Sequence, residues 1–210
     1  MDKEENVIKY YVLCNKLKNV IRTGWTCWNV KRDRLESIAE HIYGTQMLAI
    51  AMKSEYNYDI DICKVIFMLA IHEIGETVIG DLTQFQISKE EKERIEHEAV
   101  HEIFAGLLDG DILENLFLEF DNGSSKEAKF AYMCDKLECD LECRLYDEEG
   151  CVDLNDQEGN ITLNNSLVKK LLDEGNSWSE MWLKFGQTIY PYDDNFRNVS
   201  NYALKHKINK

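Results

Sequence analysis

Four residues of the types that bind metals are spread along the chain: His41, the pair His72-Glu73, and Asp135. Each lies in a stretch whose apolar spacing predicts a helix. Burying an imidazole or a carboxylate costs free energy unless the group pairs with another polar group or with a cation. A single buried histidine is more often an ordinary core residue, but imidazoles and carboxylates together suit a divalent metal ion. The sequence therefore predicts that these four side chains converge on one divalent ion.

Two further carboxylates follow the histidine-glutamate pair. Glu76 lies one helical turn beyond His72 and Glu73, from where it would reach water at the metal. Asp81 follows Gly80 just after the predicted end of that helix. Carboxylates serve as general acids or bases when burial and a nearby cation tune their pKa. Glu76 and Asp81 are therefore candidate catalytic residues, although Asp81 alone fits a solvated acid at a helix end equally well.

A rival motif lies at His97-Glu98-Ala99-Val100-His101, which matches the H-E-x-x-H pattern of zinc proteases. In that chemistry two histidines one turn apart bind zinc and a third ligand comes from elsewhere, for which Glu114 or Glu119 would serve. The preceding residues 89–94 are heavily charged, however, and the apolar side of the helix runs through other residues. A solvated amphipathic helix is the simpler interpretation.

The elements that must position these residues are all expected to be helices. The chain has a single proline, Pro191, and short segments rich in Gly, Asn and Asp separate long stretches of good helix formers. The predicted helices cover residues 4–19, 35–52, 59 or 61 to 79, 88–108, 111–120, 124–146, 165–174 and 177–187. Residues 22–25 and 147–163 are expected to be loops, and the tail after Pro191 is expected to be weakly structured. The pattern predicts one all-α domain.

The composition limits the partners and the compartment. A formal net charge of −15 argues against long nucleic acids, whose phosphates are normally held by tracks of Lys and Arg. A small phosphorylated molecule is allowed, since one Arg or Lys and a metal ion hold a single phosphate. No apolar run approaches the roughly 20 residues needed to span a membrane, and no apolar signal segment opens the chain. Seven cysteines without a regular framework indicate a reduced, cytoplasmic compartment, and Cys139 and Cys143 are interpreted as ordinary thiols rather than metal ligands.

With these residues assembled, the chain resembles the HD-domain metal-dependent phosphohydrolases. It is most similar to the branch that contains the bacterial 5'-deoxynucleotidases and their eukaryotic HD-domain-containing relatives. The resemblance covers about residues 17–145 and depends on the order and spacing of several short segments. These segments are Arg22-Thr-Gly-Trp25, Glu36-Ser-Ile-Ala-Glu-His41, Ala70-Ile-His-Glu-Ile-Gly-Glu76, Ile79-Gly-Asp-Leu82, Lys89-Glu-Glu-Lys92, Glu127-Ala-Lys-Phe130 and Asp135-Lys-Leu-Glu138.

The resemblance implies a fold and a metal site. The fold is an all-α, single-domain HD fold with the metal site between central helices. Residues 1–150 would form the phosphohydrolase core, and residues 151–210 a C-terminal helical extension packed on the same domain. The implied metal ligands are His41, His72, Glu73 and Asp135, and the implied cofactor is one divalent ion of Mn, Co, Mg, Zn, Ni or Fe.

The resemblance also implies a substrate and a reaction. Nucleoside 5'-monophosphates, in particular 2'-deoxyribonucleotides, would be hydrolysed to nucleoside and phosphate. Arg22 would contact the substrate phosphate, with Trp25 as a wall of the pocket. Glu76 would take part in catalysis, and Asp81 in catalysis or in contact with the sugar. Relatives of this kind often form homodimers, which the resemblance extends to this chain.

Glu73 departs from the pattern, because the family has aspartate after the second histidine. The glutamate carboxylate lies one methylene farther from the backbone than that of aspartate. Glutamate is an acceptable oxygen ligand, but the metal preference and the rate are expected to change. The departure keeps a second interpretation open, in which the chain is a catalytically weak or inactive nucleotide-binding or regulatory module.

Overall fold

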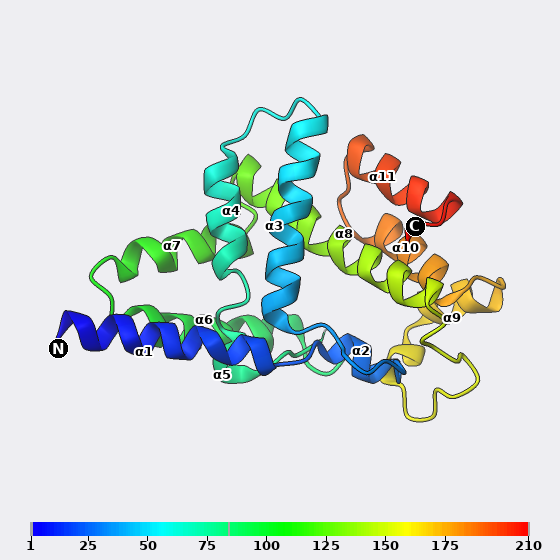
Figure 1. Ribbon diagram of the computed structural model, residues 1–210, viewed down its shortest axis with the longest axis horizontal. Helices are drawn as coiled ribbons and strands as arrows, with labels where there is room; N and C mark the ends of the chain where they lie inside the picture. Colours follow the sequence, from blue (N-terminus) through cyan, green and yellow to red (C-terminus); the bar gives the residue numbers. More distant parts are fainter. Residues whose placement is uncertain (1, 84, 210) are drawn as a thin grey trace. The chain divides into compact units, whose positions relative to one another are not determined.

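The computed structural model describes residues 2–83 and 85–209, and their regular structure is helical (Figure 1). The elements are α1 (Lys3–Asn15), η1 (Lys16–Asn19), α2 (Thr23–Cys27), α3 (Ile38–Glu55), α4 (Ile62–Ile71), α5 (Glu76–Ile79), α6 (Lys89–Phe104), α7 (Gly110–Asp121), α8 (Lys126–Glu148), η2 (Ile161–Asn164), α9 (Ser166–Asp173), α10 (Trp178–Ile189) and α11 (Asp194–Lys205), where η marks a 3₁₀ helix. Within the described residues no strand forms, and one isolated antiparallel bridge joins Ile21 to Ser37. The predicted all-α class is confirmed. None of the described helices is long and apolar enough to cross a membrane.

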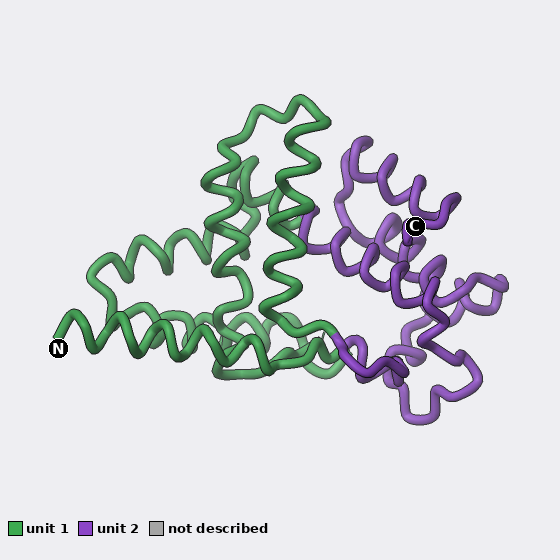
Figure 2. The backbone as a smooth tube through the Cα atoms, in the orientation of Figure 1, with its two compact units in different colours: residues 1–23, 36–132 green, residues 24–35, 133–210 purple. Residues whose placement is uncertain are grey.

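The internal contacts divide the chain into two units (Figure 2). Unit 1 comprises residues 1–23 and 36–132, and unit 2 comprises residues 24–35 and 133–210. Each unit is therefore built from two separate stretches of the chain. The predicted division at residue 150, between a phosphohydrolase core and an extension, stays a prediction.

Unit 1 has an apolar core to which both its early and its late helices contribute. In this unit α3 packs against α4, and α6 packs against α7. The buried core residues are Leu17, Ile38, Ile71, Ile74, Val100, Phe104 and Phe117. Full burial of an aliphatic or phenyl side chain stabilises the fold by about 1.5–3 kcal/mol. This core fixes the ends of α3 and α4, where the histidines His41 and His72 lie.

Unit 2 has a core dominated by aromatic rings. Trp25 packs against Tyr146 with ring centroids 5.0 Å apart, and against Trp178 at 6.0 Å. Trp28 lies 6.0 Å from the same Trp178 ring. Helix α10 packs against both α9 and α11 in this unit. Large aromatic rings bury much apolar area each, so a few of them suffice to hold these short helices together.

The prediction for the tail after Pro191 is wrong, because residues 194–205 form α11. The Asp193 carboxylate caps this helix by accepting a hydrogen bond of 3.0 Å from the Phe196 N–H. Phe196 and Ala203 are buried on its inner face. The spacing of these two apolar residues is typical of an amphipathic helix and would have predicted α11. Pro191 marks the turn before the helix and does not interrupt the helix itself.

Candidate metal centre

His41 lies in the first turn of α3 and is fully buried. The start of α3 is defined by a capping box, in which the Ser37 side chain accepts from the Glu40 N–H and the Glu40 carboxylate accepts from the Ser37 N–H. The capping box fixes the residue at which the helix begins. It therefore also fixes the direction in which His41, one position later, projects into unit 1.

His72 and Glu73 lie outside a helix, which corrects the prediction of one continuous helix to residue 79. Helix α4 ends at Ile71, His72 is its C-cap, and α5 begins only at Glu76. In the turn between them the Ile74 N–H donates to the Ile71 carbonyl at 3.0 Å, a tighter bond than the α-helical one. The His72 Nδ1 bonds the Leu69 carbonyl oxygen at 2.8 Å.

Gly75 leaves room in this turn for a side chain of α6. A Cβ atom placed on Gly75 would lie 2.7 Å from the Glu96 Cγ, closer than real Cβ contacts allow. Glycine therefore lets the Glu96 side chain of α6 approach the backbone of the turn. The apolar run that predicted a longer helix contains no other sign of this approach.

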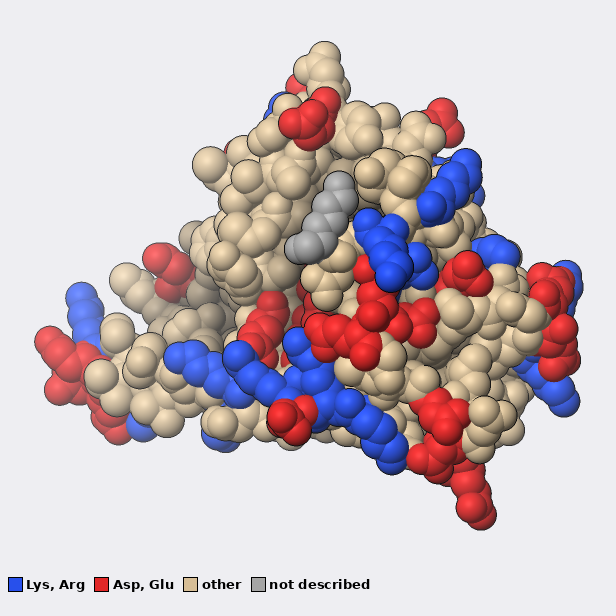
Figure 3. Space-filling model, turned by 45° about the vertical axis from the view of Figure 1, so that its right-hand side comes forward, with Lys and Arg blue, Asp and Glu red and all other residues tan. Residues whose placement is uncertain are grey.

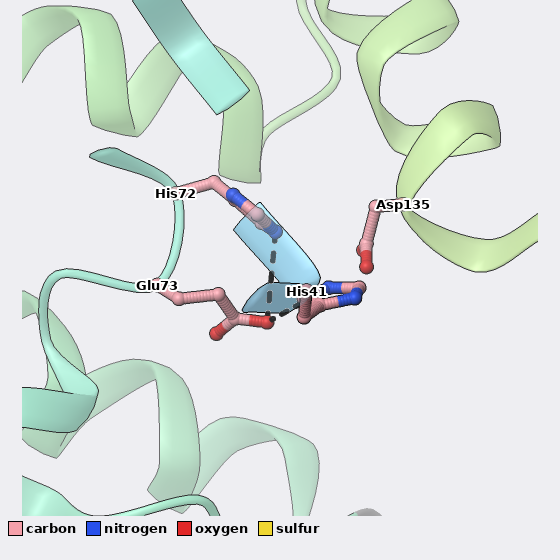
Figure 4. Close-up of side chains that lie close together, drawn as sticks. All are labelled: His41, His72, Glu73 and Asp135. Carbon is pink, nitrogen blue, oxygen red and sulfur yellow. Dashed lines mark ion pairs between the residues drawn. The ribbon is translucent and has the colours of Figure 1, made fainter. Parts of the chain in front are cut away.

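The structure brings the four predicted ligands together (Figure 4). Each of His41, His72, Glu73 and Asp135 offers one donor atom, and these atoms lie within 4.8 Å of one another. The Glu73 Oε1 lies 3.6 Å from the His72 Nε2 and 3.9 Å from the His41 Nε2. Asp135 belongs to the continuous helix α8 and is 3% exposed. Two imidazoles and two carboxylates at this spacing form a donor set suited to a divalent metal ion.

The protonation of His72 tests whether the residues fit a metal. A carbonyl oxygen only accepts hydrogen bonds, so the His72 Nδ1 that bonds the Leu69 carbonyl carries the proton. The Nε2 atom then presents its lone pair on the side of Glu73. This is the tautomer that a metal-binding histidine needs, with its other nitrogen held by a backbone carbonyl. The residues present therefore fit a divalent ion.

Arg22 lies beside this cluster. Its Nη1 is 3.4 Å from the Glu73 Oε1, and its side chain is 14% exposed. Its backbone N–H donates to the Glu36 carbonyl at 3.0 Å, just before α3 begins. The prediction of a loop over residues 22–25 is wrong, because α2 begins at Thr23. Trp25, predicted to line the pocket, is 4% exposed in the aromatic core of unit 2.

Glu76 is the first residue of α5 and is 1% exposed. Its Oε1 lies 3.2 Å from the Lys92 Nζ of α6. Burial raises the pKa of Glu76 well above its usual range, and the negative charges of Glu73 and Asp81 raise it further, while Lys92 and Arg22 lower it. Glu76 therefore holds its proton more tightly than an exposed glutamate does, which makes it a candidate for proton exchange.

The sequence motifs did not indicate the roles of two residues near Glu76. Lys92 pairs with Glu76, and Glu96 joins Glu73 and Glu76 in a second group of carboxylates whose oxygens lie within 4.8 Å of one another. Lys92 lies within a segment that matches the family, but nothing there indicated its partner.

Charges of both signs also stand side by side on the face shown in Figure 3, so the net negative charge leaves cations available for a small anion.

Asp81 is held by the start of α2. Its Oδ2 accepts a hydrogen bond of 2.6 Å from the Thr23 N–H, and its carbonyl accepts one of 2.7 Å from the Thr23 Oγ1. The preceding Gly80 has φ 76°, a backbone conformation that favours glycine. Asp81 is thus oriented by a residue 58 positions away, which distinguishes it from a solvated acid at a helix end.

The H-E-x-x-H motif does not form a metal site in the part of the chain that is described. The His97 Nε2 bonds the Asp121 Oδ2 at 2.7 Å, whereas the His101 Nδ1 bonds Glu114 at 3.0 Å. The His101 side chain is 66% exposed. Among the described residues, no group of three or more side chains that could hold a metal includes His97, His101 or a cysteine. The simpler interpretation, a solvated amphipathic helix, accounts for this segment.

Comparison with known families decides the relationship. The sequence model of the HD domain family matches residues 14–187, which is most of the chain. The chain belongs to the HD domain family. This HD-domain protein is 31% identical over 153 residues to the 5'-deoxynucleotidase HDDC2 of Dictyostelium discoideum, a match covering 69% of this chain and 79% of the relative. It is 33% identical over 148 residues to the 5'-deoxynucleotidase HDDC2 of Homo sapiens, covering 68% and 69% respectively.

Solved structures show the same fold. A predicted metal-dependent phosphohydrolase from Magnetospirillum magnetotacticum MS-1 matches with a TM-score of 0.66, at 19% identity, over 97% of this HD-domain protein and 94% of that chain. The PH0347 protein from Pyrococcus horikoshii OT3 matches with a TM-score of 0.63, at 20% identity, over 94% and 98%. At these identities the likeness concerns the fold alone.

Proposed function

We propose that this HD-domain protein is a metal-dependent phosphomonoesterase that hydrolyses nucleoside 5'-monophosphates, in particular 2'-deoxyribonucleotides, to nucleoside and phosphate. The observation that carries the proposal is the group of four buried donors with Arg22 beside it, since phosphate hydrolysis needs a cation and an anion-binding group together. The relatives named 5'-deoxynucleotidase support the substrate class.

In this proposal the ligands and the arginine prepare the phosphate. His41, His72, Glu73 and Asp135 hold the divalent ion, which when bound supplies positive charge that polarises the phosphoryl group and activates water. The Arg22 guanidinium, now 3.4 Å from Glu73, has several N–H donors with which to bind phosphate oxygens. It fixes the phosphorus atom in line with the attacking water.

Glu76 and Asp81 assist proton transfer in this proposal. Glu76 accepts a proton from the attacking water, because its raised pKa makes it a stronger base than an ordinary carboxylate. Lys92, 3.2 Å from Glu76, opposes that rise. Asp81 assists the departing 5' oxygen or contacts a sugar hydroxyl, from a position fixed by Thr23.

The test is phosphate release by the purified protein after metal removal and reloading with Mn, Co, Mg, Zn, Ni or Fe in turn. The substrates are the four common deoxyribonucleoside and the four ribonucleoside 5'-monophosphates. We expect His72→Ala to lose both metal and activity. His97→Ala, on the exposed H-E-x-x-H segment, is the matched control and should keep both. Absence of phosphate release with every metal and nucleotide would refute the proposal.

A second candidate function is favoured by the contact between Glu73 and Arg22. The longer Glu73 side chain reaches the arginine and therefore competes with phosphate for it, as expected of a nucleotide-binding or regulatory module with weak turnover. Glu73→Asp separates the two functions. A large gain of activity from a silent parent would support the module, whereas a loss of activity and metal would show that Glu73 is the working ligand.

The organisation beyond the site is also proposed. Residues 1–150 form the phosphohydrolase core, and residues 151–210 a helical extension of the same domain. Two copies form a homodimer, which light scattering after gel filtration tests by a mass near twice 24.5 kDa. A cytoplasmic location, suggested by the seven cysteines, stays a prediction.

A further inference from the structure

Asp81 lies in an irregular segment between α5 and α6, where no helix fixes the backbone conformation. Gly80, with φ 76° and ψ 170°, ends α5, and α6 begins only at Lys89. A side chain on such an irregular segment samples several rotamers unless neighbouring groups hold it. A proton donor or sugar contact needs a fixed geometry, so the bonds that hold Asp81 matter to its role.

Thr23 holds Asp81 through two groups at once. The Thr23 N–H binds the carboxylate oxygen Oδ2 at 2.6 Å, a charge-assisted hydrogen bond. The Thr23 hydroxyl binds the Asp81 carbonyl at 2.7 Å, which fixes the backbone from which the carboxylate projects. Neither bond uses the Oδ1 oxygen, so Thr23 anchors one carboxylate oxygen and the backbone carbonyl of Asp81.

Thr23 is itself well anchored in unit 1. Ile21 forms an antiparallel bridge with Ser37, and the Arg22 N–H donates to the Glu36 carbonyl at 3.0 Å. The Arg22 side chain reaches Glu73 at 3.4 Å. Residues 21–23 therefore connect the start of α3, the ligand Glu73 and Asp81 within three consecutive positions.

We propose that Thr23 is a positioning residue, whose hydroxyl holds Asp81 at a set distance from the phosphate-binding Arg22. The inference depends on the proposed phosphomonoesterase function, because it assigns Thr23 to the step that Asp81 assists. Threonine suits the task, since its branched Cβ restricts χ1 and so limits the directions of the hydroxyl.

The test compares Thr23→Val with Thr23→Ser in the full-length, metal-loaded protein, measuring phosphate release from a deoxyribonucleoside 5'-monophosphate. Valine keeps the shape and the N–H bond but removes the hydroxyl, whereas serine restores it. We expect Thr23→Val to lower kcat about tenfold, the effect of about one lost hydrogen bond, with KM changed less than about twofold. Thr23→Ser should stay within about threefold of the parent.

A double-mutant cycle with Asp81→Asn distinguishes positioning from a general structural effect. If Thr23 acts through Asp81, Thr23→Val should change kcat less than about twofold in the Asp81→Asn background. An equal loss in both backgrounds, or an unchanged kcat for Thr23→Val in an active parent, would overturn the inference alone. A parent without phosphatase activity would overturn the proposed function and this inference together. Thermal unfolding of each variant identifies a loss due to misfolding, in which case Thr23→Ala, which also removes the hydroxyl, takes the place of Thr23→Val in the same cycle.

Discussion

Glu76 in unit 1 and Asp140 in unit 2 are both deeply buried carboxyl groups, and their surroundings differ. Glu76 in unit 1 is 1% exposed and Asp140 in unit 2 is 4% exposed, and burial is the main cause that raises the pKa of both. Glu76 faces Lys92, and its Oε2 has no hydrogen-bond partner among the described residues. The Asp140 Oδ2 accepts a hydrogen bond of 3.1 Å from the Tyr192 hydroxyl.

The comparison shows that burial alone does not make an acid reactive. Burial stabilises the neutral form of Asp140, although the hydrogen bond from the Tyr192 hydroxyl and the charge of Lys136 lower its pKa. Its carboxylate packs against Gly186, which indicates a structural role. The Glu76 Oε1 lies beside the ammonium of Lys92, and its Oε2 has no hydrogen-bond partner among the described residues. An unbonded oxygen beside a cation, rather than a raised pKa alone, therefore distinguishes Glu76 as the candidate for proton exchange.

The largest expected effect contrasts the two acids directly. Glu76→Gln should lower kcat about a thousandfold, because glutamine cannot accept the proton of the attacking water. Asp140→Asn is the matched control and should change kcat less than about twofold. Phosphate release by both variants, with metal content measured in parallel, provides the check. Equal losses in the two variants would remove the distinction between them.

Substitution of Lys92 is expected to have the next largest effect on kcat. Lys92→Met keeps much of the side-chain volume and removes the ammonium 3.2 Å from Glu76. Loss of a charged hydrogen bond worth roughly 1.5–3 kcal/mol should lower kcat about tenfold to a hundredfold. Lys89→Met on the same helix is the control, since Lys89 pairs with the exposed Glu93. A Lys92→Met enzyme as active as the control would show that Glu76 works without its cation.

Gly186 probes the structural role of Asp140. A Cβ atom at Gly186 would collide with the Asp140 carboxylate, so Gly186→Ala should destabilise the protein by roughly 1–3 kcal/mol despite the better helix propensity of alanine. At Gly106 a Cβ would meet no atom within 4 Å, so Gly106→Ala should change stability by less than about 0.5 kcal/mol. Urea unfolding of the two variants measures the difference.

The smallest expected effect is on the pH dependence of stability. Because the folded-state pKa of Asp140 is raised, its contribution is complete below the unfolded-state pKa near about 4 and is lost as pH rises toward the folded-state value. Asparagine imitates the neutral acid, so Asp140→Asn should gain stability relative to the parent as pH rises from about 4 to 7. Unfolding midpoints at several pH values check this, and a constant difference across the range would contradict it.

The sequence predicted which candidate ligands lie together better than it predicted the elements that carry them. His41 and Asp135 lie on helices as expected, because apolar spacing and a capping sequence are local signals. The break after Ile71 was not predictable in this way, since it depends on the His72 bond to a carbonyl and on the approach of Glu96 to Gly75. The bond of His72 lies within its own segment, but the approach of Glu96 comes from α6 and is not a property of that segment.

The residues around Glu76 and Asp81 were missed for the same reason. Lys92 contacts Glu76 across two helices, and Thr23 contacts Asp81 across 58 positions. Residue types and spacing indicate which side chains can react, but a single sequence does not reveal which neighbours orient them. The aromatic core of unit 2 likewise draws Trp25 together with Trp178 from far along the chain.

The position of Glu73 in a turn has an evolutionary consequence. A change in the third base of a codon converts aspartate to glutamate, so this substitution arises readily. Within a helix the backbone could not readily shift to accommodate the added methylene. The turn between α4 and α5 can do so by adjusting its dihedral angles. Natural variation at the acid that follows the second histidine is therefore expected to be more frequent in relatives that share this helix break than in those where the helix is continuous.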